Sequence, residues 1–264
     1  MIITLTTDFR TADGYAGEMK GVILSLCPEA RVVDVTHDVP RGDVESGARI
    51  LQRIWDRYPP GTVHLAVVDP GVGGERRGLA AALGGRWFVG PDNGLLTLAG
   101  RSRPVETVLD LGPPPGVDAG AAPTFHGRDV FAPAAARLAR GDDPAGLGAP
   151  VAAESLVVLP LPGPERVGES VHGRVTHADR FGNLATDIPA AWLGARIVVE
   201  IGGARIDGLL RTYAEAAPGE LLALVGSDRH LEIAVRDGSA AERLSVGRDA
   251  PVVVRVAGPA TAPS

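Results

Sequence analysis

The chain has 264 residues and a formal net charge of −6, with a sequence pI near 5.5. No excess of cations is available to neutralise phosphates, so we expect neither nucleic acid nor an anionic membrane as a partner. Cys27 is the only cysteine, which excludes an intrachain disulfide and a cysteine-based zinc cluster and favours a cytoplasmic location. No apolar run reaches the roughly 20 residues needed to span a bilayer, so we expect no membrane segment.

Residues 1–157 predict an N-terminal α/β domain with a parallel sheet. Amphipathic helices are expected at 15–27 and after Asp43, where the carboxylate can cap the helix. Buried strands are expected at 2–6, 32–35, 62–68, 79–83 and 87–89. Right-handed crossovers follow from this alternation, and ligands of such sheets bind at the carboxyl ends of the strands. Those ends carry four polar residues: Asp8, His37, Asp38 and Asp69.

Residues 169–258 predict a smaller C-terminal domain, an antiparallel β-barrel. Short β-rich runs punctuated by glycine occur at 197–201, 221–225, 231–235 and 252–256. Between the two domains, three prolines make residues 158–168 a stiff extended linker. Residues 259–264 are expected to form a disordered tail.

The loop that begins at Asp69 has the composition of an active site. Glycines after the carboxylate let backbone approach a ligand. A guanidinium such as that of Arg76 favours the charged form of a nearby carboxylate, and a histidine such as His126 can orient or deprotonate a water. In the alternative interpretation, Arg76 and Arg77 are solvated loop charges and His126 caps a helix. The residues alone leave the two interpretations about level.

Other polar residues allow a functional and a structural interpretation. Asp8 and Asp13 could grip a diol, since a carboxylate accepts two hydroxyl hydrogen bonds, or could simply end a strand and cap a turn. Phe181 and Asn183 would suit a planar base but could equally belong to a β-turn, the default interpretation of the segment 92–94 as well. The candidates for a metal site are His37, Asp38, Asp69, Asp92, His126 and Asp129. No paired spacing supports a metal there, so this hypothesis is the weaker one.

Short motifs along most of the chain occur in the order of one family. They span residues 6–9, 35–38, 43–45, 67–73, 91–94, 125–129, 179–183 and 231–234. With these motifs the chain resembles the S-adenosylmethionine hydroxide adenosyltransferases, also called adenosyl-forming S-adenosylmethionine hydrolases, which are relatives of fluorinase and chlorinase. The halogenating relatives carry tyrosine where this chain has Asp69 and threonine where it has Val72. The resemblance therefore favours hydrolysis over halogenation.

The resemblance implies a homotrimer in which the substrate lies between the N-terminal domain of one subunit and the C-terminal domain of its neighbour. Water or hydroxide would attack the ribose C5′ of S-adenosyl-L-methionine and release adenosine and L-methionine, with no cofactor and no metal. The residues that match the family's catalytic set are Asp69, Arg76 and His126. The residues that match its substrate contacts are Asp8, Asp13, Tyr15, Asp179, Phe181, Asn183, Ser227, Glu232 and Val235.

Individual roles follow from the same resemblance. Asp8 corresponds to the carboxylate that binds the ribose diol, and Asp179 to the group that holds the amino end of methionine. Phe181 and Asn183 correspond to residues beside adenine, and Ser227 to a contact of the methionine carboxylate. Glu232 and the backbone near Val235 fall where the last strand closes over the nucleoside. Two alternatives are a binding module for S-adenosylmethionine or adenosine with little turnover and, less favoured, a metal-dependent hydrolase.

Overall fold

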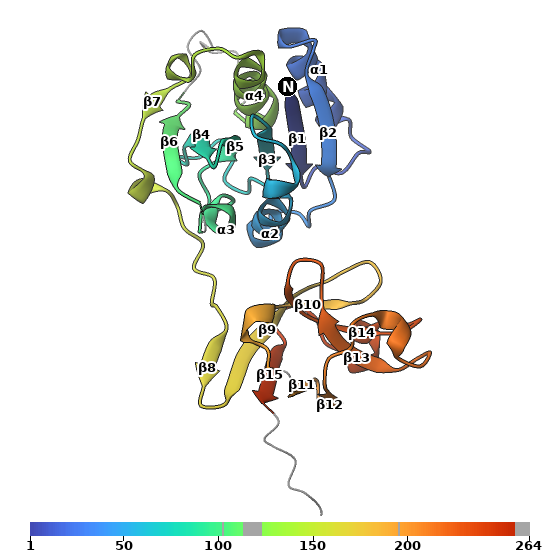
Figure 1. Cartoon of the computed structure of the whole chain (residues 1–264). Helices are drawn as coiled ribbons and strands as arrows, with labels where there is room; N and C mark the ends of the chain where they lie inside the picture. Colours follow the sequence, from blue (N-terminus) through green and yellow to red (C-terminus); the bar gives the residue numbers. More distant parts are fainter. Residues whose placement is uncertain (102, 113–122, 195, 257–264) are drawn as a thin grey trace, which may run out of the picture. The chain divides into compact units, whose positions relative to one another are not determined.

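The computed structural model describes residues 1–101, 103–112, 123–194 and 196–256. The chain divides into two compact units, Met1–Pro160 and Leu161–Ser264 (Figure 1). We call them unit 1 and unit 2 and describe each by itself. The predicted tail, 259–264, lies outside the described residues. Within the described ranges, no helix is both long and apolar enough to cross a membrane.

Unit 1 is built on a seven-stranded sheet with the order β2-β1-β3-β5-β4-β6-β7. Its strands are β1 (Ile2–Thr7), β2 (Arg31–Thr36), β3 (Val63–Val67), β4 (Gly78–Leu83), β5 (Arg86–Pro91), β6 (Val105–Asp110) and β7 (Ala149–Pro150). The first four strands in that order are parallel, as predicted, but β4 runs antiparallel to both of its neighbours. Gly84 and Gly85 explain the reversal, since both have positive φ and form the two-residue turn of a hairpin.

Helices cover both faces of this sheet (Figure 1). They are α1 (Tyr15–Leu26), α2 (Val44–Ile54), α3 (Thr97–Gly100) and α4 (Ala132–Arg140). Strand β3 is buried on both sides: Val63, Leu65 and Val67 pack in the cluster of α1 and α4, and Ala66 packs in the cluster of α2 and α3, as does Val68 just after the strand. As predicted, Asp43 caps α2 by accepting a 3.0 Å hydrogen bond from Ser46 N. The alternation along the strands thus produces a three-layer α/β unit.

Unit 2 is a nearly closed, barrel-like antiparallel sheet with the order β12-β11-β15-β9-β10-β14-β13, and β8 pairs with β9. Its elements are β8 (Glu165–Val167), β9 (Ser170–Ala178), β10 (Leu184–Pro189), β11 (Ile197–Ile201), β12 (Ala204–Asp207), β13 (Leu221–Val225), β14 (His230–Val235), α5 (Ala240–Leu244) and β15 (Pro251–Val256). Inward-facing aliphatic residues of these strands form one core. The predicted fold class, an α/β domain followed by a smaller antiparallel β-barrel domain, is confirmed. Part of the segment predicted as a linker forms β8.

Short 3₁₀ helices connect several of these elements, at Trp55–Arg57, Pro144–Gly146, Ala153–Ser155, Ala190–Trp192 and Tyr213–Glu215. A π-helical turn, Gly127–Phe131, runs directly into α4, and Pro133 is tolerated because it lies in the first turn of α4. Single π-helical turns inside helices are frequent at functional sites. This one begins immediately after His126.

Candidate active site

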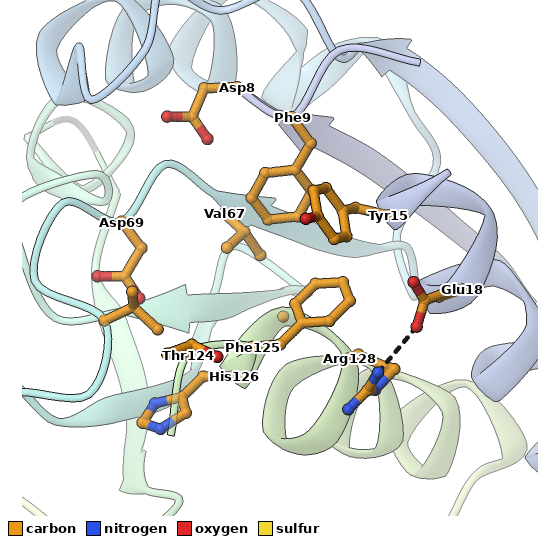
Figure 2. Close-up of a pocket in the computed structure, with 12 residues that line it drawn as sticks. Asp8, Phe9, Tyr15, Glu18, Val67, Asp69, Thr124, Phe125, His126 and Arg128 are labelled. Carbon is orange, nitrogen blue, oxygen red and sulfur yellow. Dashed lines mark hydrogen bonds and ion pairs between the residues drawn. The ribbon is translucent and has the colours of Figure 1, made fainter. Parts of the chain in front are cut away.

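A pocket of about 460 Å³ opens where the parallel strands of unit 1 end. This volume suits a small organic ligand. Asp8 follows β1, Asp69 lies just beyond β3, and His126 precedes the π-helical turn. Figure 2 shows Asp69 and His126 on one side of this pocket and the rings of Phe9, Tyr15 and Phe125 toward the other. The pocket therefore joins a polar side and an aromatic side.

Arg76 links Asp69 and His126, two of the polar residues that line the pocket. Its Nε donates a 3.0 Å hydrogen bond to Asp69 Oδ1, and one terminal nitrogen donates to the other oxygen of the same carboxylate. That terminal nitrogen also lies 2.8 Å from Nδ1 of His126. The side chains of Arg76 and Asp69 are 12% and 5% exposed, respectively. Sequence positions 69, 76 and 126 thus meet in one hydrogen-bonded group, so Arg76 is not a solvated loop charge.

The contact with Arg76 also determines how the His126 ring carries its proton. A guanidinium can only donate, so Nδ1 accepts from Arg76, and the neutral ring carries its proton on Nε2. Burial lowers the pKa of His126, and the charge of Arg76 lowers it further, against the opposing effects of Asp69 and Asp129. The neutral form of His126 is therefore favoured in the folded protein.

Glycine allows the loop after Asp69 to take this shape. Gly73 has φ of 77°, and a Cβ at this position would lie 2.7 Å from the backbone oxygen of Pro123. A larger residue would therefore push apart the loop that carries Asp69 and the segment that leads to His126. Gly71 packs more loosely, with space for a Cβ 3.4 Å from the side chain of Arg76.

Three aromatic rings form the apolar side of the pocket. The ring centroids are 6.2 Å apart for Phe9 and Tyr15, 5.9 Å for Phe9 and Phe125, and 5.3 Å for Tyr15 and Phe125, all with edge-to-face geometry. Tyr15 was predicted at the site from the resemblance, whereas Phe9 and Phe125 were not. Their positions in the sequence could have indicated this role, because Phe9 directly follows Asp8 and Phe125 directly precedes His126.

Asp8 and Asp13 have different positions. Asp8 lines the pocket, and its Oδ2 accepts a 2.8 Å hydrogen bond from Gly42 N. Asp13 is exposed in the turn before α1 and, within the described residues, is not among those that line the pocket. Of the two predicted diol ligands in unit 1, the geometry therefore supports Asp8.

Arg77, the neighbour of Arg76, makes a second ion pair. It donates to Asp92 Oδ2 at 2.5 and 3.0 Å, and also to the hydroxyl and backbone oxygen of Ser155. The buried Asp92 carboxylate additionally accepts from Val157 N at 2.9 Å. Asp92 was interpreted as a turn residue. Residues 92–94 do form a bend, and the Asp92 side chain also ties the segment around Ser155 and Val157 to the sheet.

In unit 2, a tight loop brings together Asp179, Phe181 and Asn183. Asp179 Oδ1 accepts from Phe181 N at 2.8 Å and from Asn183 N at 2.9 Å, and Gly182 in the same loop has φ of 80°. The Phe181 side chain is 78% exposed. Asp179 Oδ2 also accepts from the side chain of Asn183 at 3.3 Å, so both carboxylate oxygens shape the loop, and the Phe181 ring is left exposed on unit 2.

The remaining predicted residues lie on or near β14. Ser227 is exposed in the turn before the strand, and Val235 is buried at its end. Glu232 accepts a short hydrogen bond from the hydroxyl of Tyr213, a partner that the sequence did not predict. Burial raises the pKa of Glu232, as do the charges of Asp179 and Asp228, while the Tyr213 hydrogen bond lowers it. Local sequence holds no signal for this pairing, because Tyr213 lies in a 3₁₀ helix and is separated from Glu232 by 19 positions along the chain.

Four of the residues considered for a metal site have other side-chain partners. Asp69 and Asp92 are paired with arginines, Asp129 with Arg128, and His37 lies between Thr7 and Asp34. In the described part of the chain, no group of three or more His, Cys, Asp or Glu side chains is arranged to hold a metal ion.

The fold and the site define a two-domain protein whose α/β unit carries a pocket with an aspartate, arginine and histidine group. Models of the SAM hydroxide adenosyltransferase N-terminal and C-terminal domains match residues 3–148 and 173–253. The chain therefore belongs to the SAM hydroxide adenosyltransferase family, and the predicted membership is confirmed.

Relatives of known sequence or structure agree with this assignment. The chain is 44% identical over 255 residues to the (R)-S-adenosyl-L-methionine hydrolase of Thermus thermophilus, covering 93% of this chain and 96% of the relative. It is 28% identical over 271 residues to a fluorinase of Actinoplanes sp., covering 88% and 90% of the two chains. The crystal structure of an uncharacterized conserved protein from Thermotoga maritima is similar, with a TM-score of 0.89, 32% identity, and coverage of 97% of this chain and 100% of that chain.

Proposed function

We propose that the protein hydrolyses S-adenosyl-L-methionine, with water or hydroxide attacking the ribose C5′ and releasing adenosine and L-methionine. The observation that carries the proposal is the hydrogen-bonded group of Asp69, Arg76 and His126 at the pocket. The names of relatives that are 35–44% identical to this chain agree with the same activity.

The difficult part of this reaction is the activation of the nucleophile, because water is a weak one. The C5′–S bond breaks as the C5′–O bond forms, and the electron pair passes to a sulfonium, which leaves as a neutral thioether. No acid is needed to protonate the leaving group. Bulk water has a pKa of about 15.7, so the site must align one water behind C5′ and polarise it.

Asp69 is suited to orient that water and to accept its proton. Arg76 occupies one lone pair on each carboxylate oxygen, and each oxygen keeps a further acceptor site. A carboxylate that faces the pocket would accept a hydrogen bond from the water and stabilise positive charge as it develops on the attacking oxygen.

His126 is suited to position the water. With Nδ1 accepting from Arg76, the neutral ring has a donor at Nε2 and no free acceptor. The sequence-based hypothesis gave His126 a part in proton movement. The hydrogen-bond pattern favours Asp69 as the first proton acceptor.

For substrate binding, we assign the ribose diol to Asp8 and the wall beside the substrate to Tyr15, since both line the pocket. The adenine contacts of Phe181 and Asn183, the methionine contacts of Asp179 and Ser227, and the closing strand at Glu232 and Val235 remain proposals from the family resemblance. The same holds for a homotrimer in which a neighbouring subunit completes each site. The Phe181 ring is exposed and therefore accessible to a ligand or to a second copy of the chain.

We also propose that the reaction needs no cofactor or metal, because a neutral leaving group gives a Lewis acid no anion to stabilise. A cytoplasmic location is proposed as well, supported by the free thiol of Cys27. Unchanged turnover after treatment with a chelator is expected. Loss of turnover that returns on adding a divalent ion would favour the metal-dependent alternative.

The deciding experiment is incubation with S-adenosyl-L-methionine in ¹⁸O-labelled water, followed by mass spectrometry of the products. We expect the label in the 5′-hydroxyl of adenosine and unlabelled L-methionine. Tight binding of the substrate with no product would favour the binding module instead. Label in any other product would contradict attack at C5′.

A further inference from the structure

His37 follows β2 and is 5% exposed, yet the mechanism above gives it no role. It was considered as a metal ligand, but its surroundings link it to the neighbouring loop after β1. That loop carries Asp8 and Phe9 into the pocket. His37 is therefore placed to influence the segment that presents the Asp8 carboxylate.

His37 contacts this segment on both sides of Asp8 and Phe9. Its Nδ1 lies 2.8 Å from Thr7 Oγ1, and its backbone oxygen accepts a 2.7 Å hydrogen bond from Arg10 N. The Thr7 hydroxyl also accepts from Phe9 N at 3.3 Å. Because Thr7 precedes Asp8 and Arg10 follows Phe9, the imidazole and backbone of a single residue fix both ends of the segment.

The segment needs such support because it is strained. Arg10 has φ of 57°, a conformation that costs free energy for a residue with a side chain. Its hydrogen bond to His37 holds it there. Asp8 itself accepts from Gly42 N, which belongs to the same loop as His37. The direction of the Asp8 carboxylate thus depends on the loop after β2.

The imidazole is also anchored from elements outside this loop. Its Nε2 lies 3.1 Å from Asp34 Oδ1 on β2, an ion-pair distance without the alignment of a hydrogen bond. Lys20 on α1 donates to the other oxygen of Asp34 at 2.6 Å. The ring is therefore fixed between α1, β2 and the end of β1.

We infer that His37 is a positioning residue for substrate binding: through Thr7 and Arg10 it fixes the direction in which the Asp8 carboxylate meets the ribose diol. The inference rests on the proposed function, which assigns the diol of S-adenosylmethionine and adenosine to Asp8. His37 itself need not touch the substrate.

The chain contains a matched control. Thr4 Oγ1 and His64 Nδ1 are also 2.8 Å apart, and this pair likewise joins two neighbouring parallel strands of the sheet. It lies three residues before Thr7 on β1, inside the core. A Thr4→Val substitution removes the same kind of contact as Thr7→Val without changing the segment that carries Asp8.

The test compares the affinities of adenosine and 2′,3′-dideoxyadenosine by calorimetry, using the full chain. For the wild type we expect adenosine to bind at least about tenfold more tightly, because a carboxylate forms strong hydrogen bonds to both hydroxyls. The ratio should fall severalfold in His37→Ala and Thr7→Val, approaching that of Asp8→Asn. His37→Asn, which keeps a polar atom near the Nδ1 position, should retain most of it. Thr4→Val should lower thermal stability and leave the ratio unchanged.

The outcomes separate the inference from the proposed function. If the wild type discriminates and folded His37→Ala and Thr7→Val keep the full ratio, the positioning role is wrong while the proposed function stands. Equal weakening of both ligands in these variants would also overturn it, because general loosening of the pocket does not depend on the diol. If the wild type binds neither nucleoside, or binds both equally, the assignment of the diol to Asp8 fails and the inference fails with it.

Discussion

Two histidines of unit 1, His64 and His126, share a lowered pKa but differ in their surroundings. His64 lies fully buried in β3, between Thr4 and the ring of Trp55, whose centroid is 4.7 Å away. His126 lines the pocket and is bonded to Arg76. Burial is the main cause of the lowered pKa in both. A perturbed histidine therefore reports burial. What distinguishes the candidate site histidine, His126, is its charged partner and its position in the pocket.

The consecutive arginines Arg76 and Arg77 show the same contrast between a residue of the candidate site and a residue of the structural framework. Each makes a two-point ion pair with an aspartate, Arg76 with Asp69 and Arg77 with Asp92. Asp69 lines the pocket, whereas Asp92 holds the backbone at Val157. Two neighbouring arginines thus form arginine–aspartate pairs with different positions. The pair of Arg76 belongs to the candidate site, and the pair of Arg77 belongs to the structural framework of unit 1.

The largest effect is expected from Asp69→Asn. Losing the carboxylate that orients the water should lower kcat by about 10³-fold, since a positioned acid or base typically contributes 10²–10⁴-fold. The variant should also lose stability, because the Asp69 side chain is only 5% exposed and its carboxylate pairs with Arg76. Initial rates of adenosine formation, together with a melting curve, measure both.

Arg76→Lys provides the matched control for that variant. A lysine keeps the positive charge but cannot bond both carboxylate oxygens and His126 together, so we expect a partial loss of kcat. Full turnover by Asp69→Asn with normal substrate affinity would contradict the assignment of the water to Asp69.

The next largest effect concerns His64 and acid. Burial lowers the pKa of His64 to about 4 in the folded protein, whereas the unfolded chain takes up this proton near the ordinary value of 6.5. Because the folded pKa is depressed, its contribution to stability is complete above pH 6.5 and is lost as the pH falls toward 4. The loss should reach about 3 kcal/mol.

Urea unfolding of the wild type and His64→Asn between pH 7 and 4 isolates this contribution. Carboxylates titrate in both proteins, so the difference between the two free energies of unfolding reports the histidine alone. We expect the advantage of the wild type to shrink steadily over this range. A constant difference would show that His64 is not kept neutral by the core.

Parts of the site followed from the sequence because strand ends in a parallel sheet meet at one edge. That rule brought Asp8 and Asp69 to the same pocket. The pairing of Arg77 with Asp92 was missed, although a signal existed: a two-residue turn at Gly84 and Gly85 sets the register that pairs Gly78 with Pro91, one step from these residues.

Other parts depend on packing over long sequence distances. The antiparallel direction of β4 follows from the hairpin turn at Gly84 and Gly85, which is local in sequence. The contact of Tyr213 with Glu232, in contrast, requires the whole arrangement of unit 2. Likewise, nothing local to His37 indicates that it holds Thr7 and Arg10. Such contacts are set by which elements become neighbours, and a single sequence gives that information only coarsely.

A smaller effect, on stability alone, is expected from Asp92→Asn. The carboxylate is buried and accepts from Arg77 and Val157 N, so the variant loses its charge and part of this bonding. We expect a loss of about 2 kcal/mol in the free energy of unfolding, with kcat nearly unchanged. Asp69→Asn should lose stability as well, but only that variant should also lose most of kcat. If Asp92→Asn abolished turnover at full stability, the division between the two ion pairs would be wrong.

The smallest effect on stability is expected from Phe181→Ala. The ring is 78% exposed and contributes little to the core of unit 2, so the free energy of unfolding should change by less than about 0.5 kcal/mol. If Phe181 stacks on adenine, KM should nevertheless rise about tenfold, because base stacking on an aromatic ring contributes roughly 1–3 kcal/mol. Val225, also exposed in unit 2 at 42%, gives the matched control Val225→Ala. An unchanged KM in Phe181→Ala would mean that Phe181 is an ordinary surface residue. The candidate site would then be limited to the pocket of unit 1.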